Sequence, residues 1–330
     1  MAGTEFYTGR RSKGFCYAVE PSYGVANSAL TWAWPGYVEE FNADDDKQLL
    51  ELSPMDGEDT RFVGEYLEQV PSYGGSLVMK MQHLRFLAVL GVGTDAVTDT
   101  DLHTITPTPE LPSFSFQVGH LHSTAPFTTQ YTGAKIKKWE IQWPKGEYIK
   151  QSFDIVAQNV IKVSGTGKGY QASATPLKKY TQTAMPNRRS SGGIFIVNSI
   201  NIAPYVTAAN FSFDNNLLIE PSLDAATGDL ISEPICQTPS IEASLSVKMK
   251  ESDIWDLWKS GASCGACTFG SQRSATDYFK INFSNAKLSK ANKPIKIGDG
   301  IVIQDLNFKI PSFVLTEKNG IVTDYDAVCA

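Results

Sequence analysis

The sequence predicts a mainly β protein made of two tandem β-sandwich or β-barrel repeats, each flanked by one short α-helix. Two observations lead to this prediction: the chain repeats itself internally, and short segments of alternating apolar and polar residues lie between Gly and Pro residues. Each repeat has the order strand, helix and several strands, without the alternation of strands and helices that builds a parallel sheet. With 330 residues, 42% of them hydrophobic, the chain can form about two domains with cores of their own.

The internal repeat is visible when residues 37–93 are aligned without a gap to the stretch 168 positions later. The two segments share 16 identical pairs in 57 positions, whereas ordinary composition gives about 3 or 4 at ~6% per position. Polar identities such as Asn42 with Asn210 are among them. Farther along the chain, 134–136 resembles 286–288, so the intervening loops differ in length. The repeat predicts two similarly folded copies.

Hydrophobic periodicity assigns elements to each copy. Alternation predicts a strand at 77–81, and helical spacing follows at 84–90 in the first copy and at 254–258 in the second, each helix ended by a glycine. Ile136 and Trp139 are out of phase, which predicts a β-bulge between them. Further strands are expected at 114–118, 139–143, 149–155, 279–283 and 306–310.

These elements divide the chain into four parts. We expect an N-terminal arm at 1–36, a first β domain at 37–160, a basic connector or loop at 161–194 and a second β domain at 195–330.

The connector is the basic part of the chain. No acidic residue lies between Asp154 and Asp214, and 164–193 is rich in Gly, Ser, Thr and Lys. This composition fits either a solvated linker or an arm that docks on an acidic surface of another subunit. The candidates for such an inter-subunit contact are Lys168, Lys178, Lys179, Arg188 and Arg189.

Acidic residues gather in both copies. The stretch 38–68 holds eleven acids and two bases, a net charge of −9, so the rest of the chain sums to +3 of the total of −6. The matching stretch 206–236 holds five acids and no base. Acidity is therefore a shared property of the two copies.

Composition also excludes several classes of protein. Residues 1–13 are polar and lead into no apolar stretch, so no secretory signal is expected. The longest apolar run, 86–92, is far shorter than the roughly 20 residues of a membrane helix. The mildly acidic net charge does not indicate nucleic-acid affinity. We therefore expect a soluble protein, made in a cytoplasm, with no membrane partner.

No combination of residues supports catalysis, so we expect a protein that is not an enzyme and holds no cofactor. The four histidines lack metalloprotease spacing, and no phosphate-binding loop or nucleophile elbow follows a strand. Cys264 and Cys267 form the one metal-like spacing, and His120 and His122 could complete a zinc site only if the fold brings the two copies together. The simpler interpretation is a pair of reduced thiols in a tight loop, since five cysteines in a long chain do not form a disulfide framework.

Several segments resemble the tail tube proteins of tailed double-stranded DNA viruses. The most specific are Leu-Pro-Ser-Phe-Ser-Phe-Gln-Val-Gly at 111–119 and Tyr-Thr-Gly-Ala-Lys-Ile at 131–136, supported by Gly-Ser-Leu-Val-Met-Lys at 75–80 with its following helix and by 146–157. The resemblance covers about 37–160 well and the second copy more loosely.

The resemblance implies a structural virion protein, assembled in the host cytoplasm. Such proteins join their sheets into rings that stack into a hollow tube, through which double-stranded DNA leaves the capsid without specific binding. Two copies in one chain then imply a trimeric ring with pseudo-sixfold symmetry, with a hexamer as the alternative. Further implied partners are the tape measure protein and the tail completion and baseplate proteins. The candidates for an acidic lumen wall are Asp44, Asp45, Asp46, Asp56, Asp214 and Asp224.

Other classes of protein remain open from sequence. A sheath, terminator or baseplate-hub protein is the nearest alternative among tail components. A carbohydrate-binding β-sandwich would use Trp32, Trp34 and Tyr37, which we expect to be exposed aromatic residues. That protein would be a stable monomer, whereas a tube protein assembles.

Overall fold

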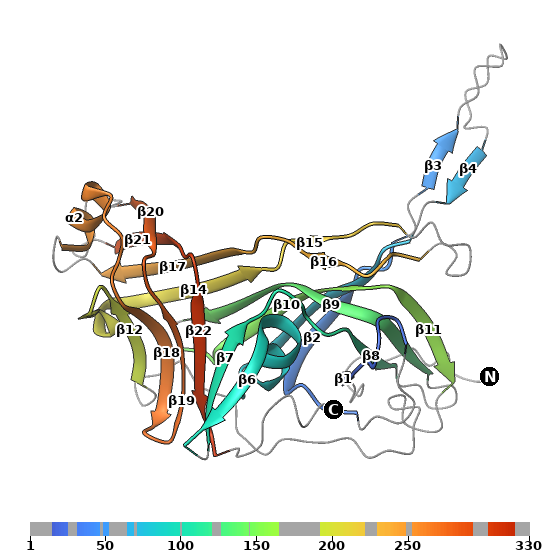
Figure 1. The fold of residues 1–330 in the computed structure, drawn as a ribbon, viewed down its shortest axis with the longest axis horizontal. Helices are drawn as coiled ribbons and strands as arrows, with labels where there is room; N and C mark the ends of the chain where they lie inside the picture. Colours follow the sequence, from blue (N-terminus) through green and yellow to red (C-terminus); the bar gives the residue numbers. More distant parts are fainter. Residues whose placement is uncertain are drawn as a thin grey trace, which may run out of the picture.

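The computed structural model consists mainly of antiparallel strands in two stacked sheets (Figure 1). It describes residues 15–25, 32–46, 49–52, 65–68, 71–99, 101–120, 127–144, 146–164, 192–221, 230–248, 253–292 and 303–320. The prediction of a mainly β fold is confirmed. The expected N-terminal arm and basic connector lie mostly outside the described residues.

The strands of the larger sheet are β1 (Phe15–Val19), β2 (Tyr37–Ala43), β5 (Tyr73–Lys80), β8 (Phe114–His120), β9 (Phe127–Trp143), β10 (Lys150–Ala157), β11 (Asn159–Ser164), β14 (Val206–Asp214), β17 (Ser240–Lys248), β20 (Lys287–Asn292) and β21 (Ile303–Lys309). The sheet supplies the upper layer of Figure 1 through β9, β10, β14 and β17, while its strands β1 and β8 lie below β9. Eight of its strands follow each other in the order β2-β5-β10-β9-β14-β17-β21-β20. The first half of β9 leaves this path and pairs with β8 and β11, so β9 belongs to two strand arrays at once.

The second sheet forms the lower layer. Its strands are β6 (Gly93–Thr98), β7 (Leu102–Pro107), β12 (Gly192–Val197), β13 (Ile200–Asn201), β18 (Cys267–Ser274), β19 (Asp277–Phe283) and β22 (Phe313–Lys318). Their order is β13-β12-β18-β19-β22-β7-β6. The β6-β7 hairpin therefore extends a sheet that otherwise comes from the C-terminal half, with Leu315 of β22 opposite Ile105 of β7.

Two small hairpins and four short helical segments complete the described fold. The hairpins are β3 (Leu49–Leu52) with β4 (Glu65–Glu68), and β15 (Leu217–Leu218) with β16 (Ile235–Cys236). The helical segments are α1 (Arg85–Leu87), η2 (Ala88–Val92), η3 (Ala203–Tyr205) and α2 (Asp253–Ser260). In Figure 1 the β3-β4 hairpin stands away from the sheets.

The two four-stranded stretches of the large sheet have matching registers. In the first, Val38 pairs with Met79 and a bulge follows at Glu39. In the second, Val206 pairs with Val247 and the bulge follows at the next residue. The positions differ by 168, which is the shift that aligns the sequence with itself. Strand order and local irregularities thus coincide in both stretches.

The bulge predicted between Ile136 and Trp139 is confirmed. Lys138 lies opposite Asp154, and the next pair is Ile136 with Ile155, so the residue between is left over. This extra residue changes which side of β9 faces the core, and both Ile136 and Trp139 are buried as a result.

The helix predicted at 84–90 has a different form. Only Arg85–Leu87 is α-helical, and Ala88–Val92 continues as a wider π turn. Leu84, Phe86 and Leu90 are all fully buried, so tertiary packing sets the path of this short segment. The second predicted helix is α2, and Gly261 follows it with a left-handed φ of 67°.

Candidate assembly surface

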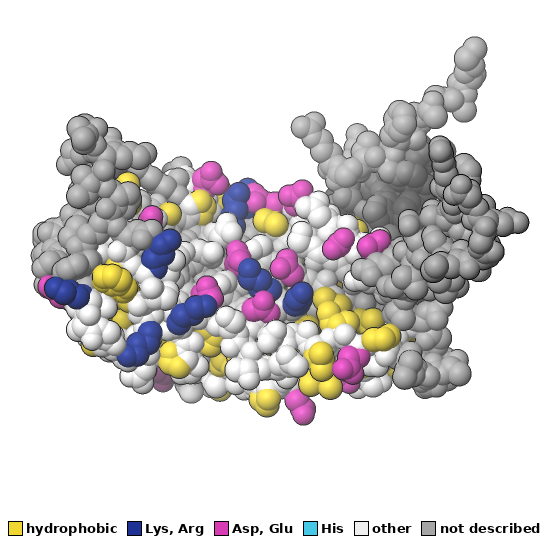
Figure 2. All heavy atoms as spheres, turned by 90° about the horizontal axis from the view of Figure 1, so that it is seen from above, with side chains coloured by type: hydrophobic (Ala, Val, Ile, Leu, Met, Phe, Trp, Pro, Cys, Tyr) yellow, Lys and Arg dark blue, Asp and Glu magenta, His cyan; other side chains and the backbone are white. Residues whose placement is uncertain are grey.

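The polar face of the large sheet follows directly from strand alternation. In β5, Leu77 and Met79 point into the core and are 0% and 1% exposed, while Ser76 and Lys80 point the other way. The same alternation in the neighbouring strands leaves one broad sheet face with polar and charged side chains. Figure 2 looks onto this face and shows basic and acidic side chains interspersed across it.

Lysines on this face are paired with nearby carboxylates. Lys138 Nζ lies 2.6 Å from Glu140 Oε1, and Lys80 Nζ lies 3.2 Å from Glu39 Oε1. Lys309 forms an ion pair with Glu242 across β17 and β21. Exposed pairs of this kind contribute little to stability. Their effect here is that fixed charges of opposite sign lie side by side.

The pairing also determines how these groups titrate. The hydrogen bond to Glu140 raises the pKa of Lys138, and the neighbouring Asp214 adds to this effect. The charge of Glu39, followed by that of Glu147, raises the pKa of Lys150. Both lysines therefore remain charged at neutral pH. Burial raises the pKa of Asp154 on the adjacent strand.

The two ends of the eight-strand path are β2 and β20. Among the described residues, each has a ladder partner on one side only, whereas β9 and β14 pair on both sides. Burial reflects this difference: Phe211 of β14 is fully buried, and most of β2 is exposed. Unpaired backbone N–H and C=O groups along such edges can template pairing with another chain.

The junction between β9 and β14 shows how an edge of this kind is closed. Trp139 lies opposite Phe213 in the ladder, and its ring centroid is 5.4 Å from Phe211 and 5.7 Å from Phe213. Phe313 from the second sheet packs 6.0 Å from the same ring. The backbone ladder between β9 and β14 and the aromatic packing on the core face of the sheet together join the two stretches into one sheet.

The β15-β16 hairpin covers part of the first strand stretch. Lys135 Nζ donates to the carbonyl of Pro234 at 3.2 Å and lies 2.8 Å from Glu233 Oε1. Tyr23 donates its hydroxyl to the carbonyl of Ser232 at 3.2 Å. The cover leaves the Lys135 side chain only 6% exposed.

The acidic candidates from sequence lie in different surroundings. Asp44, Asp45 and Asp46 are exposed at the end of β2, and Asp214 ends β14 opposite Lys138. Asp45 accepts a hydrogen bond from the Tyr131 hydroxyl at 2.9 Å, so it is tied to the core side of the sheet. Asp56, Asp224 and the basic candidates Lys168, Lys178, Lys179, Arg188 and Arg189 lie outside the described residues.

Cys264 and Cys267 are free thiols, and both are buried. A hydrogen bond between them raises the pKa of Cys264 and lowers that of Cys267. Within the described part of the chain, no group of three or more His, Cys, Asp or Glu side chains could hold a metal ion. His122, one of the two suggested zinc ligands, is not described.

The expectation that Trp32 is exposed is wrong. Its side chain is 4% exposed and packs with Cys16 and Ala18 in a small cluster. Trp34 is half-buried and lies 5.4 Å from Tyr37, ring to ring. The three residues therefore do not form one exposed aromatic platform.

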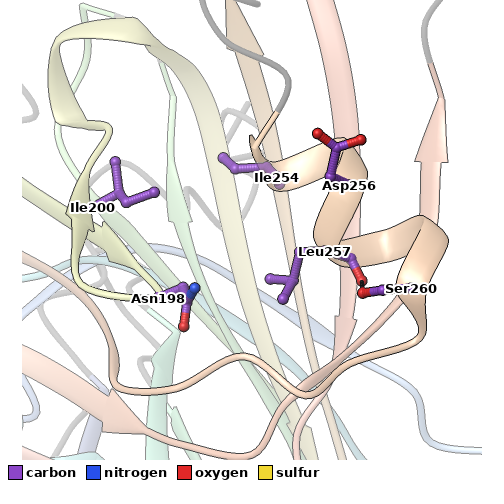
Figure 3. A pocket seen from close by; sticks show the side chains of 6 residues that line it. All are labelled: Asn198, Ile200, Ile254, Asp256, Leu257 and Ser260. Atoms are coloured by element: carbon purple, nitrogen blue, oxygen red, sulfur yellow. Dashed lines mark hydrogen bonds between the residues drawn. The ribbon is translucent and has the colours of Figure 1, made fainter.

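A surface cavity of about 370 Å³ lies between α2 and the β12-β13 turn. Its walls combine the apolar Ile200, Ile254 and Leu257 with polar groups at the rim (Figure 3). Among the described residues that line it, Asp256 is the one with an ionisable side chain. A lone carboxylate of this kind is no acid and base pair.

Sequence reasoning missed the two hairpins and the lysines of the polar face. The signal for the hairpins was present, because Leu49-Leu50 and Leu217-Leu218 are identical pairs that precede a variable stretch. Runs of like charge along the sequence do not reveal these lysines, because the ladder places single charges from distant strands side by side.

The fold and its surface define a structural β protein with open sheet edges and a charge-balanced sheet face. Comparison with protein families agrees: the family model described as phage tail tube protein matches residues 11–310. The chain belongs to the phage tail tube protein family and is a structural component of the virion. No curated protein matches the chain significantly. The described residues contain no helix long and apolar enough to cross a membrane.

Proposed function

We propose that the chain assembles head to tail into closed rings, and that the rings stack into a tube through which double-stranded DNA is ejected. The observation that carries this proposal is the position of β2 and β20 at opposite ends of one sheet path. Two different edges on one chain favour a repeating contact, which closes into a ring when the rotation per subunit allows.

The proposed ring contains three chains with pseudo-sixfold symmetry, and a ring of six chains is the alternative. Support comes from the two strand stretches with matching order and register. We propose that they are tandem copies in two β domains, 37–160 and 195–330, with 161–194 as the connector. Each copy then contributes four strands to a closed wall.

The polar face of the large sheet is proposed to line the channel. Lysine and carboxylate side chains alternate there, so the wall offers DNA no continuous basic track. Sustained phosphate binding would require uncompensated cations that release counterions. A wall with few uncompensated cations suits DNA in transit, and the contribution of the acidic lumen candidates of both copies remains a prediction.

The proposal includes two groups of partners: the tape measure protein inside the tube, and the completion and baseplate proteins at its ends. It also includes assembly in the host cytoplasm. The basic connector would act as a staple between subunits. A sheath, terminator or baseplate-hub role is the nearest alternative. Among these, a tube protein is distinguished by forming long tubes when purified alone.

Electron microscopy of the purified full-length chain tests the proposal. We expect hollow tubes whose ring averages contain three chains and six similar densities. Six whole chains per ring would overturn the trimer, and a chain that stays monomeric at high concentration would overturn assembly altogether. In a matched binding assay, assembled tubes should retain no linear DNA at physiological salt; tight retention would contradict the channel role.

A further inference from the structure

We infer that the residues 44–46 that follow β2 in one subunit pair with residues 290–292 of β20 in the next, in the register of the internal β9-β14 ladder, which places Lys290 opposite Asp46. The same contact brings the β3-β4 hairpin over the second half of the neighbouring subunit. This inference rests on the proposed head-to-tail assembly and specifies its interface. The partner is a second copy of this chain.

The first support is that β2 occupies the place of β14. Asn42 lies opposite Ser76 in one pair of strands, and Asn210 lies opposite Ser244 in the other. Beyond the end of β2, Asp46 forms an isolated bridge to Ser72, as Asp214 does to Ser240 in the β14-β17 ladder. The side of β2 that has no ladder partner among the described residues therefore corresponds to the side on which β14 pairs with β9.

The second support is that β20 occupies the place of the second half of β9. Lys138 follows the bulge in β9 and lies opposite Asp154, and Lys290 follows a bulge in β20 and lies opposite Asn307. Lys138 and Lys290 differ by 152 positions, which is the shift that aligns 134–136 with 286–288. The side of β20 on which the described part of the chain provides no ladder partner thus corresponds to the side on which β9 pairs with β14.

Joining the two correspondences fixes the register. Lys138 lies opposite Asp214 in the internal ladder. The equivalent residues across the subunit boundary are Lys290 and Asp46, both of which are exposed in the single chain. A lysine and a carboxylate again face each other, so the charge pattern of the internal junction is retained.

Charge also selects head-to-tail pairing over pairing of like edges. The segment after β2 that this register places opposite β20 carries Asp44 and Asp46, whereas β20 carries Lys287 and Lys290. Pairing of two copies of the first segment would oppose acids to acids, and pairing of two β20 strands would oppose lysines to lysines. The contact between β20 and the segment after β2 is the complementary one.

The hairpins supply independent support. Leu49 pairs with Glu68 in β3-β4, and Leu217 pairs with Cys236 in β15-β16, again at a difference of 168. The β15-β16 hairpin covers Lys135 within the chain. The equivalent Lys287 is exposed, and its Nζ bonds the carbonyl of Gly261. Since β3-β4 stands off its own chain (Figure 1), it is free to cover Lys287 of the neighbour.

Cysteine cross-linking in the full-length chain tests the register. In the double variant K290C/D46C, the proposed register places the two new cysteines of neighbouring subunits directly opposite each other. Their Cα atoms then lie within the separation that a disulfide spans. We expect a ladder of covalent multimers under mild oxidation, at least tenfold stronger than in either single variant, which controls for the native cysteines. The matched control K290C with D44C is displaced by two residues, about 7–8 Å away, and should cross-link weakly.

A charge exchange provides the second test. Lys290→Asp or Asp46→Lys alone should raise the concentration needed for assembly about fivefold, and the two together should restore it. Circular dichroism of the unassembled chains confirms folding of these exposed variants. Tubes without the K290C to D46C cross-link, or with no rescue, would overturn the register while leaving the proposed function intact. Absence of tubes in the unmodified protein would instead overturn the proposed function.

Discussion

Trp139 is expected to be the most costly single truncation at the junction of the two strand stretches. Its side chain is 1% exposed, and three aromatic rings lie within 6.0 Å of its own ring centroid. Replacement by Ala removes a large buried ring and leaves a cavity that the surrounding β ladder closes only in part. The expected loss in free energy of unfolding is about 3–5 kcal/mol.

Urea unfolding of unassembled chains, followed by far-ultraviolet circular dichroism, measures this loss. Trp139→Phe keeps most of the ring packing and removes an indole N–H that has no hydrogen-bond partner among the described residues, so it should cost less than about 1.5 kcal/mol. Trp258→Ala is the more exposed control, at 38% exposure, and should lose clearly less stability than Trp139→Ala. A loss below about 1 kcal/mol in Trp139→Ala would refute the view that this packing joins the two stretches.

Three further predictions concern single residues. Burial lowers the pKa of His83 to about 3, so the folded protein loses stability as the pH falls below about 6.5, the ordinary pKa of histidine in the unfolded chain. The expected loss is about 2 kcal/mol at pH 5, and thermal melts of His83→Gln should not show it. Both carboxylate oxygens of Glu317 accept the Leu84 N–H, at 3.0 and 3.1 Å, so Glu317→Ala should cost about 1–3 kcal/mol in urea unfolding; an unchanged midpoint contradicts this. A Cβ on Gly75 would lie 2.1 Å from a backbone oxygen at a φ of 149°, so Gly75→Ala should cost about 1–3 kcal/mol, whereas Gly192→Ala, in open space, should be neutral.

The parts of the fold that depend on local sequence could be predicted. Alternation at Leu77 and Met79 located a strand, and the phase change between Ile136 and Trp139 located a bulge. Both signals come from side chains that choose between a core and a solvent face, so neighbouring residues suffice to reveal them.

Long-range pairing was beyond local signals. Nothing near Ile105 indicates that β7 pairs with β22, some two hundred positions later. Trp32 was misjudged for the same reason, because the residues that bury it, Cys16 and Ala18, come from a separate strand. The opposite charges of the polar face likewise meet only through the ladder, as in Lys309 with Glu242.

The branching of β9 has a mechanical consequence. This single strand of 17 residues spans about 56 Å at ~3.3 Å per residue, and its two halves belong to different strand arrays. A load on one array is therefore carried to the other by covalent backbone as well as by side-chain contact. A wall built from such strands would resist shear between the two strand arrays without any added cross-link.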